Sequence, residues 1–143
     1  MRIIGGEARG RVLKSREGNG TRPTDSQSRE ALFNILGERI VEANVLDLYA
    51  GTGAVGIEAL SRGARSCTFV EQNALACRVI RDNLKLLGYG ERTTVWNTGV
   101  RTALSRLVRN GAGFEFVFAD PPFIRKPKTT LMSVTGPSVG RTQ

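Results

Sequence analysis

The sequence has 143 residues, of which 40% are hydrophobic and 24% charged, with no histidine and a formal net charge of +8 at neutral pH. This length and composition favour a single soluble domain, because one hydrophobic core usually occupies roughly 100–200 residues. No apolar run approaches the roughly 20 residues of a membrane span, and the first residues reach glycine and charge too early for a signal peptide, so the sequence predicts a cytoplasmic protein.

The side chains that commonly bind metals are scarce. Cys67 and Cys77 are too far apart for a CxxC pair, and the chain has no histidine to complete a common site, so we expect no metal. The lack of histidine also removes the commonest general base, and any chemistry must proceed without one.

The first predicted element is a small N-terminal β-hairpin. Two apolar-rich runs, residues 2–5 and 11–14, flank a polar segment with glycines, and Arg9 and Arg11 would project from it. Positive charge is concentrated at the two ends of the chain: residues 1–24 hold six Lys or Arg against two Glu, and residues 125–143 hold four against none. Charge alone leaves two interpretations open, a solvated basic surface and an arm that contacts phosphates.

Strand and helix patterns alternate through the middle of the chain. A helix capped near residues 24–26 is expected to run to about residue 40. Short apolar runs then predict four strands, with helices between them at residues 55–62, 73–87 and 101–109. Such alternation predicts an α/β fold of the Rossmann-like type, with a mostly parallel sheet and helices on both faces. The strands are expected at residues 45–50, 67–71, 93–97 and 114–119.

We divide the chain into three parts. Residues 1–24 form the hairpin and a basic arm, and residues 25–123 form the core of the fold. Residues 124–143 are rich in Lys, Thr, Ser, Gly and Pro without a periodic apolar face, so they are expected to be a disordered tail. The fourth strand would then have an unpaired edge.

A glycine-rich turn follows the first predicted strand. The pattern G-x-G-x-x-G begins at Gly51 and Gly53, and Glu71 at the end of the next strand can accept hydrogen bonds from both hydroxyls of a ribose. These residues fit NAD and S-adenosylmethionine alike. Asp47, four residues before the first glycine, would repel a pyrophosphate and attract a cationic amino-acid group, which favours S-adenosylmethionine.

Each residue of this turn also has a structural interpretation. Asp47 could simply brace the turn, because Asp readily bonds local backbone, and Glu71 could be a surface acid. The glycines could form an ordinary turn between a strand and a helix.

A second turn, formed by Asp120, Pro121, Pro122 and Phe123, directly follows the fourth predicted strand. It would emerge at the same carboxyl edge of the sheet as the glycines, where open α/β folds bind ligands. The Asp120 carboxylate and the Pro121 carbonyl can accept the two hydrogens of an amino group, and Phe123 can stack on a base. The alternative is a stiff strand-exit turn with Phe123 in the core.

These motifs resemble the RsmD family, bacterial methyltransferases that act on the exocyclic N2 of one guanine in 16S ribosomal RNA. The resemblance covers about residues 2–123. Its first run (residues 2–6 with 10–11) and its last run (residues 58–64) are absent from generic methyltransferases. The resemblance rests on RIIGG (residues 2–6) with GR (10–11), RPT (22–24) with REALFNIL (29–36), LDLYAGTG (46–53) and EALSRGA (58–64).

The resemblance implies a role for each motif. Asp47, Gly51, Gly53 and Glu71 would hold S-adenosylmethionine, Asp120 to Phe123 would hold the guanine, and the hairpin with Arg22 would contact RNA. The implied partner is 16S rRNA or a small-subunit assembly particle. The protein is expected to act as a monomer and not to bind a membrane. The family's chain continues past the second turn to complete a seven-stranded sheet, so the C-terminal strands are expected to be missing here.

Other functions stay open. In the family the second turn usually ends in Tyr. Phe123 lacks the hydroxyl of Tyr, so adenine-N6 methylation of a nucleic acid remains an alternative. The missing strands would also suit a truncated, non-catalytic remnant that binds RNA or S-adenosylmethionine. A nucleotide-binding oxidoreductase rests only on the glycines and Glu71.

Overall fold

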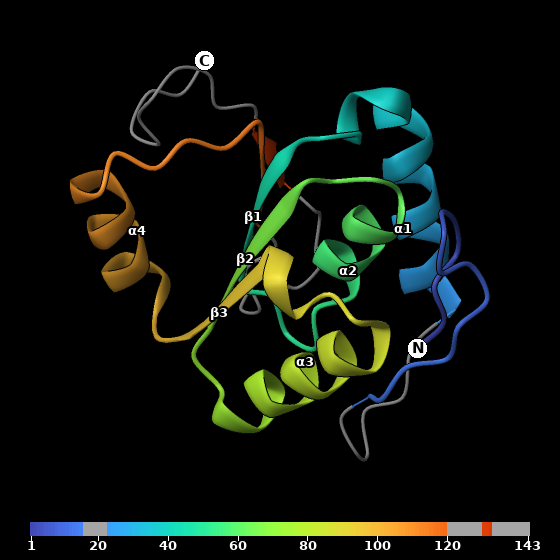
Figure 1. The fold of residues 1–143 in the computed structure, drawn as a ribbon, viewed down its shortest axis with the longest axis horizontal. Coiled ribbons are helices and arrows are strands. Elements are labelled where there is room, and N and C mark those ends of the chain that lie inside the picture. Colours follow the sequence, from blue (N-terminus) through green and yellow to red (C-terminus); the bar gives the residue numbers. More distant parts are fainter. Residues whose placement is uncertain (16–22, 120–129, 133–143) are drawn as a thin grey trace.

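The computed structural model describes residues 1–15, 23–119 and 130–132 (Figure 1). Its described residues form a five-stranded sheet in the order β3-β2-β1-β4-β5. β1, β2, β3 and β4 are parallel, and β5 is antiparallel to β4. The strands are β1 (Asn44–Leu48), β2 (Ser66–Glu71), β3 (Thr93–Asn97), β4 (Phe116–Ala119) and β5 (Thr130–Met132).

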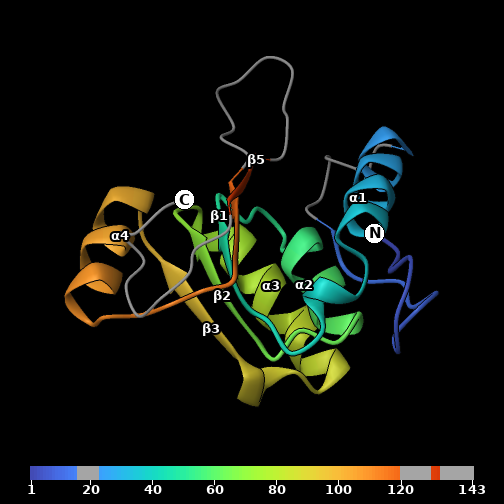
Figure 2. The ribbon, with the colours of Figure 1, turned by 90° about the horizontal axis from the view of Figure 1, so that it is seen from above.

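Helices cover both faces of this sheet. Figure 2 shows α1, α2 and α3 on one face and α4 on the other. The Rossmann-like α/β fold expected from the alternating pattern is therefore confirmed. The helices are α1 (Pro23–Leu36), α2 (Ala54–Ser61), α3 (Ala74–Leu87) and α4 (Val100–Arg109), with 3₁₀ turns η1 (Gly37–Ile40) and η2 (Gly90–Arg92).

The two faces of the sheet bury separate apolar clusters, and successive residues of β1 alternate between them. Val45 packs with Phe33 and Phe69 on the face of α1 to α3, whereas Leu46 packs with Leu107 on the face of α4. Burial on both faces explains why β1 and β4 are largely continuous apolar runs rather than alternating ones.

Local signals in the sequence set the helix ends. The Asn73 side chain accepts a hydrogen bond from the Ala76 N–H at 2.9 Å and caps α3, which ends at Gly88 with a φ of 74°. The helix predicted to reach residue 40 ends earlier, at Leu36, because Gly37 has a φ of 54° and the chain continues as a 3₁₀ turn. No helix in the described part of the chain is long and apolar enough to cross a membrane.

The structure differs from the sequence expectation after β4. No strand was predicted beyond residue 119, yet β5 pairs with β4, with Phe118 opposite Leu131. The predicted unpaired edge of β4 is therefore wrong. The physical reason is that free N–H and C=O groups on an edge strand attract a further strand, and β5 begins with the β-branched Thr130. The rest of residues 124–143 lies outside the described residues, so its disorder stays a prediction.

Candidate functional site

Three parallel strands end side by side at one edge of the sheet. Leu48, the last residue of β1, lies opposite Val70 on β2 and Ala119 on β4. The glycine turn after β1, the carboxylate at the end of β2 and the chain leaving β4 therefore meet at this carboxyl edge, which is where open α/β folds bind ligands.

The glycine turn reverses the chain through left-handed backbone conformations. Tyr49, Gly51 and Gly53 have φ angles of 54°, 60° and 85°. The Ala50 N–H donates to the Val70 carbonyl at 3.0 Å, and the Gly53 N–H donates to the Ala50 carbonyl at 2.9 Å. For Tyr49 this conformation costs about 1–2 kcal/mol, so the surrounding contacts hold a strained residue directly before the turn.

The three glycines of the pattern serve different purposes. A Cβ on Gly56 would lie 2.3 Å from Phe69 Cε1, so this glycine allows α2 to pack closely on β2. A Cβ on Gly53 would lie 3.2 Å from Ile80 Cγ1, in addition to the positive φ. A Cβ on Gly51 would meet no atom of the described residues within 4 Å, so this backbone is open to an approaching ligand.

Glu71 joins two turns at the carboxyl edge. Its Oε1 accepts a hydrogen bond from the Gly51 N–H at 2.8 Å, and its Oε2 accepts one from the Asn73 N–H at 2.8 Å. The side chain is half-buried, and each carboxylate oxygen has a second lone pair to offer a ribose hydroxyl. Because it bonds two backbone N–H groups, Glu71 is not a free surface acid. Ribose binding by Glu71 stays a prediction.

Asp47 lies beneath the start of α2. It is 4% exposed, and its Oδ2 accepts a hydrogen bond from the Gly56 N–H at 3.1 Å. This contact is the bracing role that the sequence left open. It also places a negative charge at the positive end of the α2 dipole, where a pyrophosphate would otherwise bind. Burial raises the pKa of the neighbouring Cys67 thiol well above its usual value, and the Asp47 charge adds to this effect.

The N-terminal hairpin is present. Arg2 and Val12 form an antiparallel bridge, and the Ile3 N–H donates to the Arg11 carbonyl at 3.0 Å. The side chains of Arg9 and Arg11 are exposed, as a surface that contacts phosphates requires. Arg22 lies outside the described residues, so its role stays a prediction.

The second predicted turn also lies outside the described residues. The roles of Asp120, Pro121, Pro122 and Phe123 therefore stay predictions. The preceding residue, Ala119, is described and pairs with Leu48 at the end of β4.

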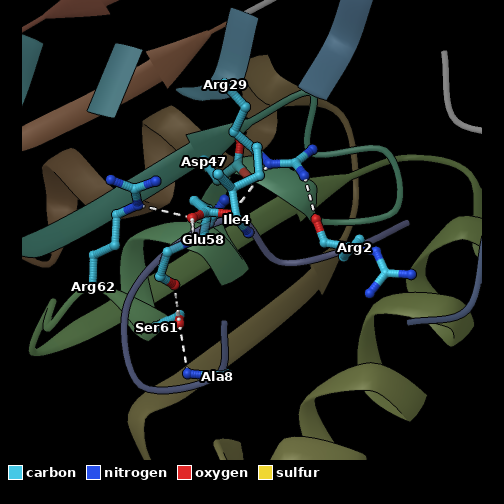
Figure 3. Close-up of polar contacts among 10 residues, drawn as sticks. Arg2, Ile4, Ala8, Arg29, Asp47, Glu58, Ser61 and Arg62 are labelled. Atoms are coloured by element: carbon cyan, nitrogen blue, oxygen red, sulfur yellow. Dashed lines mark hydrogen bonds and ion pairs between the residues drawn. The ribbon is translucent and has the colours of Figure 1, made fainter. Parts of the chain in front are cut away.

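Glu58, a buried acid that contacts the N-terminal hairpin, was not singled out from the sequence. This acid is 1% exposed within α2, which is otherwise almost entirely apolar, and it accepts hydrogen bonds from the N-terminal hairpin (Figure 3). A charged residue in the middle of an apolar helix is the signal that could have found it, because a buried charge requires partners.

A separate cavity of about 510 Å³ lies between α3 and β3. It is lined by Arg81, Leu84, Lys85, Gly88, Gly90, Glu91, Thr93 and Val95. Because Thr93 begins β3, this cavity reaches the amino end of the strand, opposite to the carboxyl edge that holds the predicted site residues.

The fold and the glycine turn are those of the Rossmann-like class I methyltransferase fold, which solved methyltransferase structures share. The model of the family "Conserved hypothetical protein 95" matches residues 1–136. The chain belongs to this family, which is the RsmD family that its sequence resembles.

Known relatives agree with this assignment. The chain is 37% identical over 134 residues to "Putative rRNA methyltransferase YlbH" of Bacillus subtilis, covering 94% of this chain and 73% of the relative. It is 42% identical over 125 residues to "Ribosomal RNA small subunit methyltransferase D" of Escherichia coli K12, covering 87% of this chain and 61% of the relative. The chain thus spans about two thirds of the length of these relatives.

Solved structures show the same fold. "Putative methyltransferase yhhF from Escherichia coli" is 42% identical with a TM-score of 0.74, and the match covers 86% of this chain and 64% of that one. The S-adenosylmethionine-dependent methyltransferase from Agrobacterium tumefaciens shares the fold at 22% identity with a TM-score of 0.62, over 78% of this chain and 36% of that one.

Proposed function

We propose that this protein is an S-adenosylmethionine-dependent methyltransferase that modifies the exocyclic N2 of a guanine in 16S rRNA. The single observation that carries the proposal is the geometry of the carboxyl edge, where Glu71 holds the open Gly51 turn and Asp47 occupies the start of α2. The names of the relatives, which include ribosomal RNA small subunit methyltransferases, support an RNA substrate.

The residues at this edge fit the cofactor. Glu71 would hold the ribose of S-adenosylmethionine, and the Gly51 backbone leaves room for it. The buried Asp47 carboxylate favours the cationic amino-acid end of this cofactor and disfavours the pyrophosphate of NAD, because a second anion at the same helix end is repelled. When bound, S-adenosylmethionine supplies an electrophilic methyl group on a sulfonium centre.

The protein's remaining task is to hold the acceptor nitrogen. The Asp120 carboxylate and the Pro121 carbonyl would accept the two hydrogens of the amino group, so that its nitrogen lone pair faces the methyl donor. Phe123 would stack on the base. Positioning of this kind requires no histidine, which agrees with the composition of the chain.

The basic hairpin would bind the RNA. Arg9 and Arg11 are exposed on it, and Arg22 follows in the sequence. Their partner would be 16S rRNA or a small-subunit assembly particle, whose phosphates attract a chain with a net charge of +8.

The test is transfer of a labelled methyl group from S-adenosylmethionine to 16S rRNA that lacks the modification, followed by nucleoside analysis. We expect N2-methylguanosine from the unmodified chain. Asp120→Ala should abolish transfer and leave binding of S-adenosylhomocysteine within about twofold, because Asp120 is proposed to touch only the acceptor.

Other results would contradict parts of the proposal. N6-methyladenosine as the product would favour the adenine alternative, which the Phe123 side chain keeps open. Binding of cofactor and RNA without transfer would favour a non-catalytic module.

A further inference from the structure

One buried carboxylate anchors the N-terminal hairpin on α2. The Oε1 of Glu58 accepts hydrogen bonds from the Ile4 N–H at 3.0 Å and from Arg29 Nε at 3.2 Å. Its Oε2 accepts hydrogen bonds from the Gly5 N–H at 2.8 Å and from Arg62 Nε at 2.8 Å. These contacts (Figure 3) leave Glu58 1% exposed with two arginines and two backbone groups as partners among the described residues.

Neighbouring side chains reinforce the same junction. Arg29 of α1 is 4% exposed, and its Nη2 donates to the Arg2 carbonyl at 2.6 Å. The Ser61 hydroxyl donates to the Gly5 carbonyl at 2.7 Å and accepts from the Ala8 N–H at 3.0 Å. Because hydrogen bonds are directional, these contacts allow the hairpin one orientation on α1 and α2.

Shape restricts the hairpin as well. A Cβ on Gly6 would lie 2.0 Å from the Ser61 carbonyl oxygen, so only glycine allows the two backbones to approach. A Cβ on Gly111, which follows α4 and lies outside the hairpin, would meet no atom of the described residues within 4 Å.

The same helix carries the glycine turn. α2 has eight residues, which corresponds to about 12 Å of helix. Gly53 caps its start, and the Gly56 N–H bonds to Asp47, whereas Glu58 and Ser61 follow in its second half. The distance between the hairpin and the glycine turn is therefore set by a short, rigid element.

We propose that Glu58 is a positioning residue that fixes the hairpin, and with it Arg9 and Arg11, relative to the glycine turn. The role rests on the proposed function, in which the hairpin contacts RNA and the turn holds the cofactor. RNA bound by the arginines then reaches the methyl donor in one register.

A buried ion pair suits this task better than an apolar contact. Taking the charges of Glu58 and Arg29 out of water is costly, and apolar side chains of similar size often give equal or greater stability. An apolar contact would, however, permit sliding between the hairpin and α2. A carboxylate with defined donors specifies one geometry.

The first test compares two glycine variants of the full chain. Gly6 and Gly111 have φ angles of +80° and +69°, so Gly6→Ala and Gly111→Ala both strain the backbone, but Gly6→Ala also forces the hairpin away from Ser61. We expect Gly6→Ala to lower kcat for transfer to 16S rRNA by about tenfold or more, because a small displacement of a bound substrate is enough for such a loss. Gly111→Ala should stay within about threefold of the unmodified chain, and KM for S-adenosylmethionine should change by less than about twofold in both variants.

The second test is Glu58→Gln. The amide keeps the shape of the side chain but replaces one acceptor oxygen with a donor, so the Ile4 or the Gly5 N–H loses its partner. The same fall in kcat is expected, with binding of S-adenosylhomocysteine retained. If this variant does not fold, Gly6→Ala still decides the question, since it leaves the Arg29–Glu58 pair in place.

Three results would overturn the inference. An unchanged kcat in Gly6→Ala would do so and leave the proposed function standing. Loss of cofactor binding together with transfer in Gly6→Ala would mean that the hairpin merely supports the fold. Absence of transfer by the unmodified chain would remove the proposed function, and the positioning role with it.

Discussion

The carboxylates of Glu71 and Asp47, which the sequence predicts to bind a cofactor, accept hydrogen bonds from backbone N–H groups. Glu71 serves Gly51 and Asn73, and Asp47 serves Gly56. Each acid therefore shapes the glycine turn in addition to any contact with a ligand. Substitutions at either position are expected to change both stability and binding.

Replacement of Glu71 separates these effects best. Glu71→Gln keeps the size of the side chain but leaves either the Gly51 or the Asn73 N–H facing a donor, so we expect a loss of about 1–3 kcal/mol in the free energy of unfolding. Binding of S-adenosylhomocysteine should weaken about tenfold or more, since the ribose loses an acceptor. Denaturant unfolding and calorimetry measure the two quantities.

The matched control is Glu91→Gln. Glu91 is exposed on η2, away from the carboxyl edge, so this change should alter the free energy of unfolding by less than about 0.5 kcal/mol. Equal cofactor binding by Glu71→Gln and Glu91→Gln would contradict the role assigned to Glu71.

The third glycine of the pattern allows a prediction about packing. Gly56→Ala would place a Cβ 2.3 Å from Phe69 Cε1 and 2.7 Å from Cys67 Sγ. Such overpacking between α2 and β2 should lower the free energy of unfolding by about 1–3 kcal/mol, measured with urea. Gly90→Ala is the control, because its Cβ would meet no described atom within 4 Å; equal stability of the two variants would refute the packing role of Gly56.

At the scale of elements, the repeated alternation of apolar runs and helical periodicity predicted β1 to β4 and α1 to α4 within a few residues. This succeeded because β1 and β4 are largely buried apolar runs and because α3 has local end signals, Asn73 and Gly88. β5 was missed because its three residues depend on the edge of β4, a tertiary feature that no local pattern shows.

The candidate site was predictable to a similar extent. The glycine turn and Glu71 meet at one edge, as parallel strands require. The hairpin anchor was not predicted, because Glu58 contacts Ile4 and Gly5 more than fifty residues away in sequence. Long-range contacts of a buried acid leave only a weak local signal, a charge within an apolar helix.

The hairpin carries a prediction about RNA binding. Arg9→Ala and Arg11→Ala should each weaken binding of 16S rRNA. Each should also reduce the magnitude of the slope of log K against log salt concentration by about one, the value expected for one lost phosphate contact. Arg109→Ala is the control, because Arg109 is exposed at the end of α4 on the opposite face of the sheet. Equal salt slopes for all three variants, measured by filter binding, would argue against the hairpin as the RNA surface.

At the scale of the whole molecule, stability should fall in alkaline solution. Burial raises the pKa of Cys67 well above its ordinary value of 9.0, and burial also raises the pKa of Tyr89 from 10.0. Above these ordinary values the unfolded chain loses protons that the folded chain keeps, so the free energy of unfolding decreases as pH rises. Well below pH 9, where both groups keep their protons in the folded and the unfolded chain, they contribute almost no pH dependence.

Unfolding titrations between pH 8 and pH 11 would measure this effect. Cys67→Ala lowers stability at every pH but should flatten the part of the decline that begins near pH 9. An identical decline with and without the thiol would show that Cys67 is not its source.

S-adenosylmethionine is proposed to bind at the carboxyl edge of the sheet, which the contacts of Glu71 and Asp47 and the family assignment support. The most direct test is calorimetric titration of the 143-residue chain with S-adenosylhomocysteine and, separately, with NADH. We expect S-adenosylhomocysteine to bind with a Kd on the order of micromolar, and NADH to bind at least about a hundredfold more weakly. Tighter binding of NADH, or no binding of S-adenosylhomocysteine by the folded chain, would contradict the account.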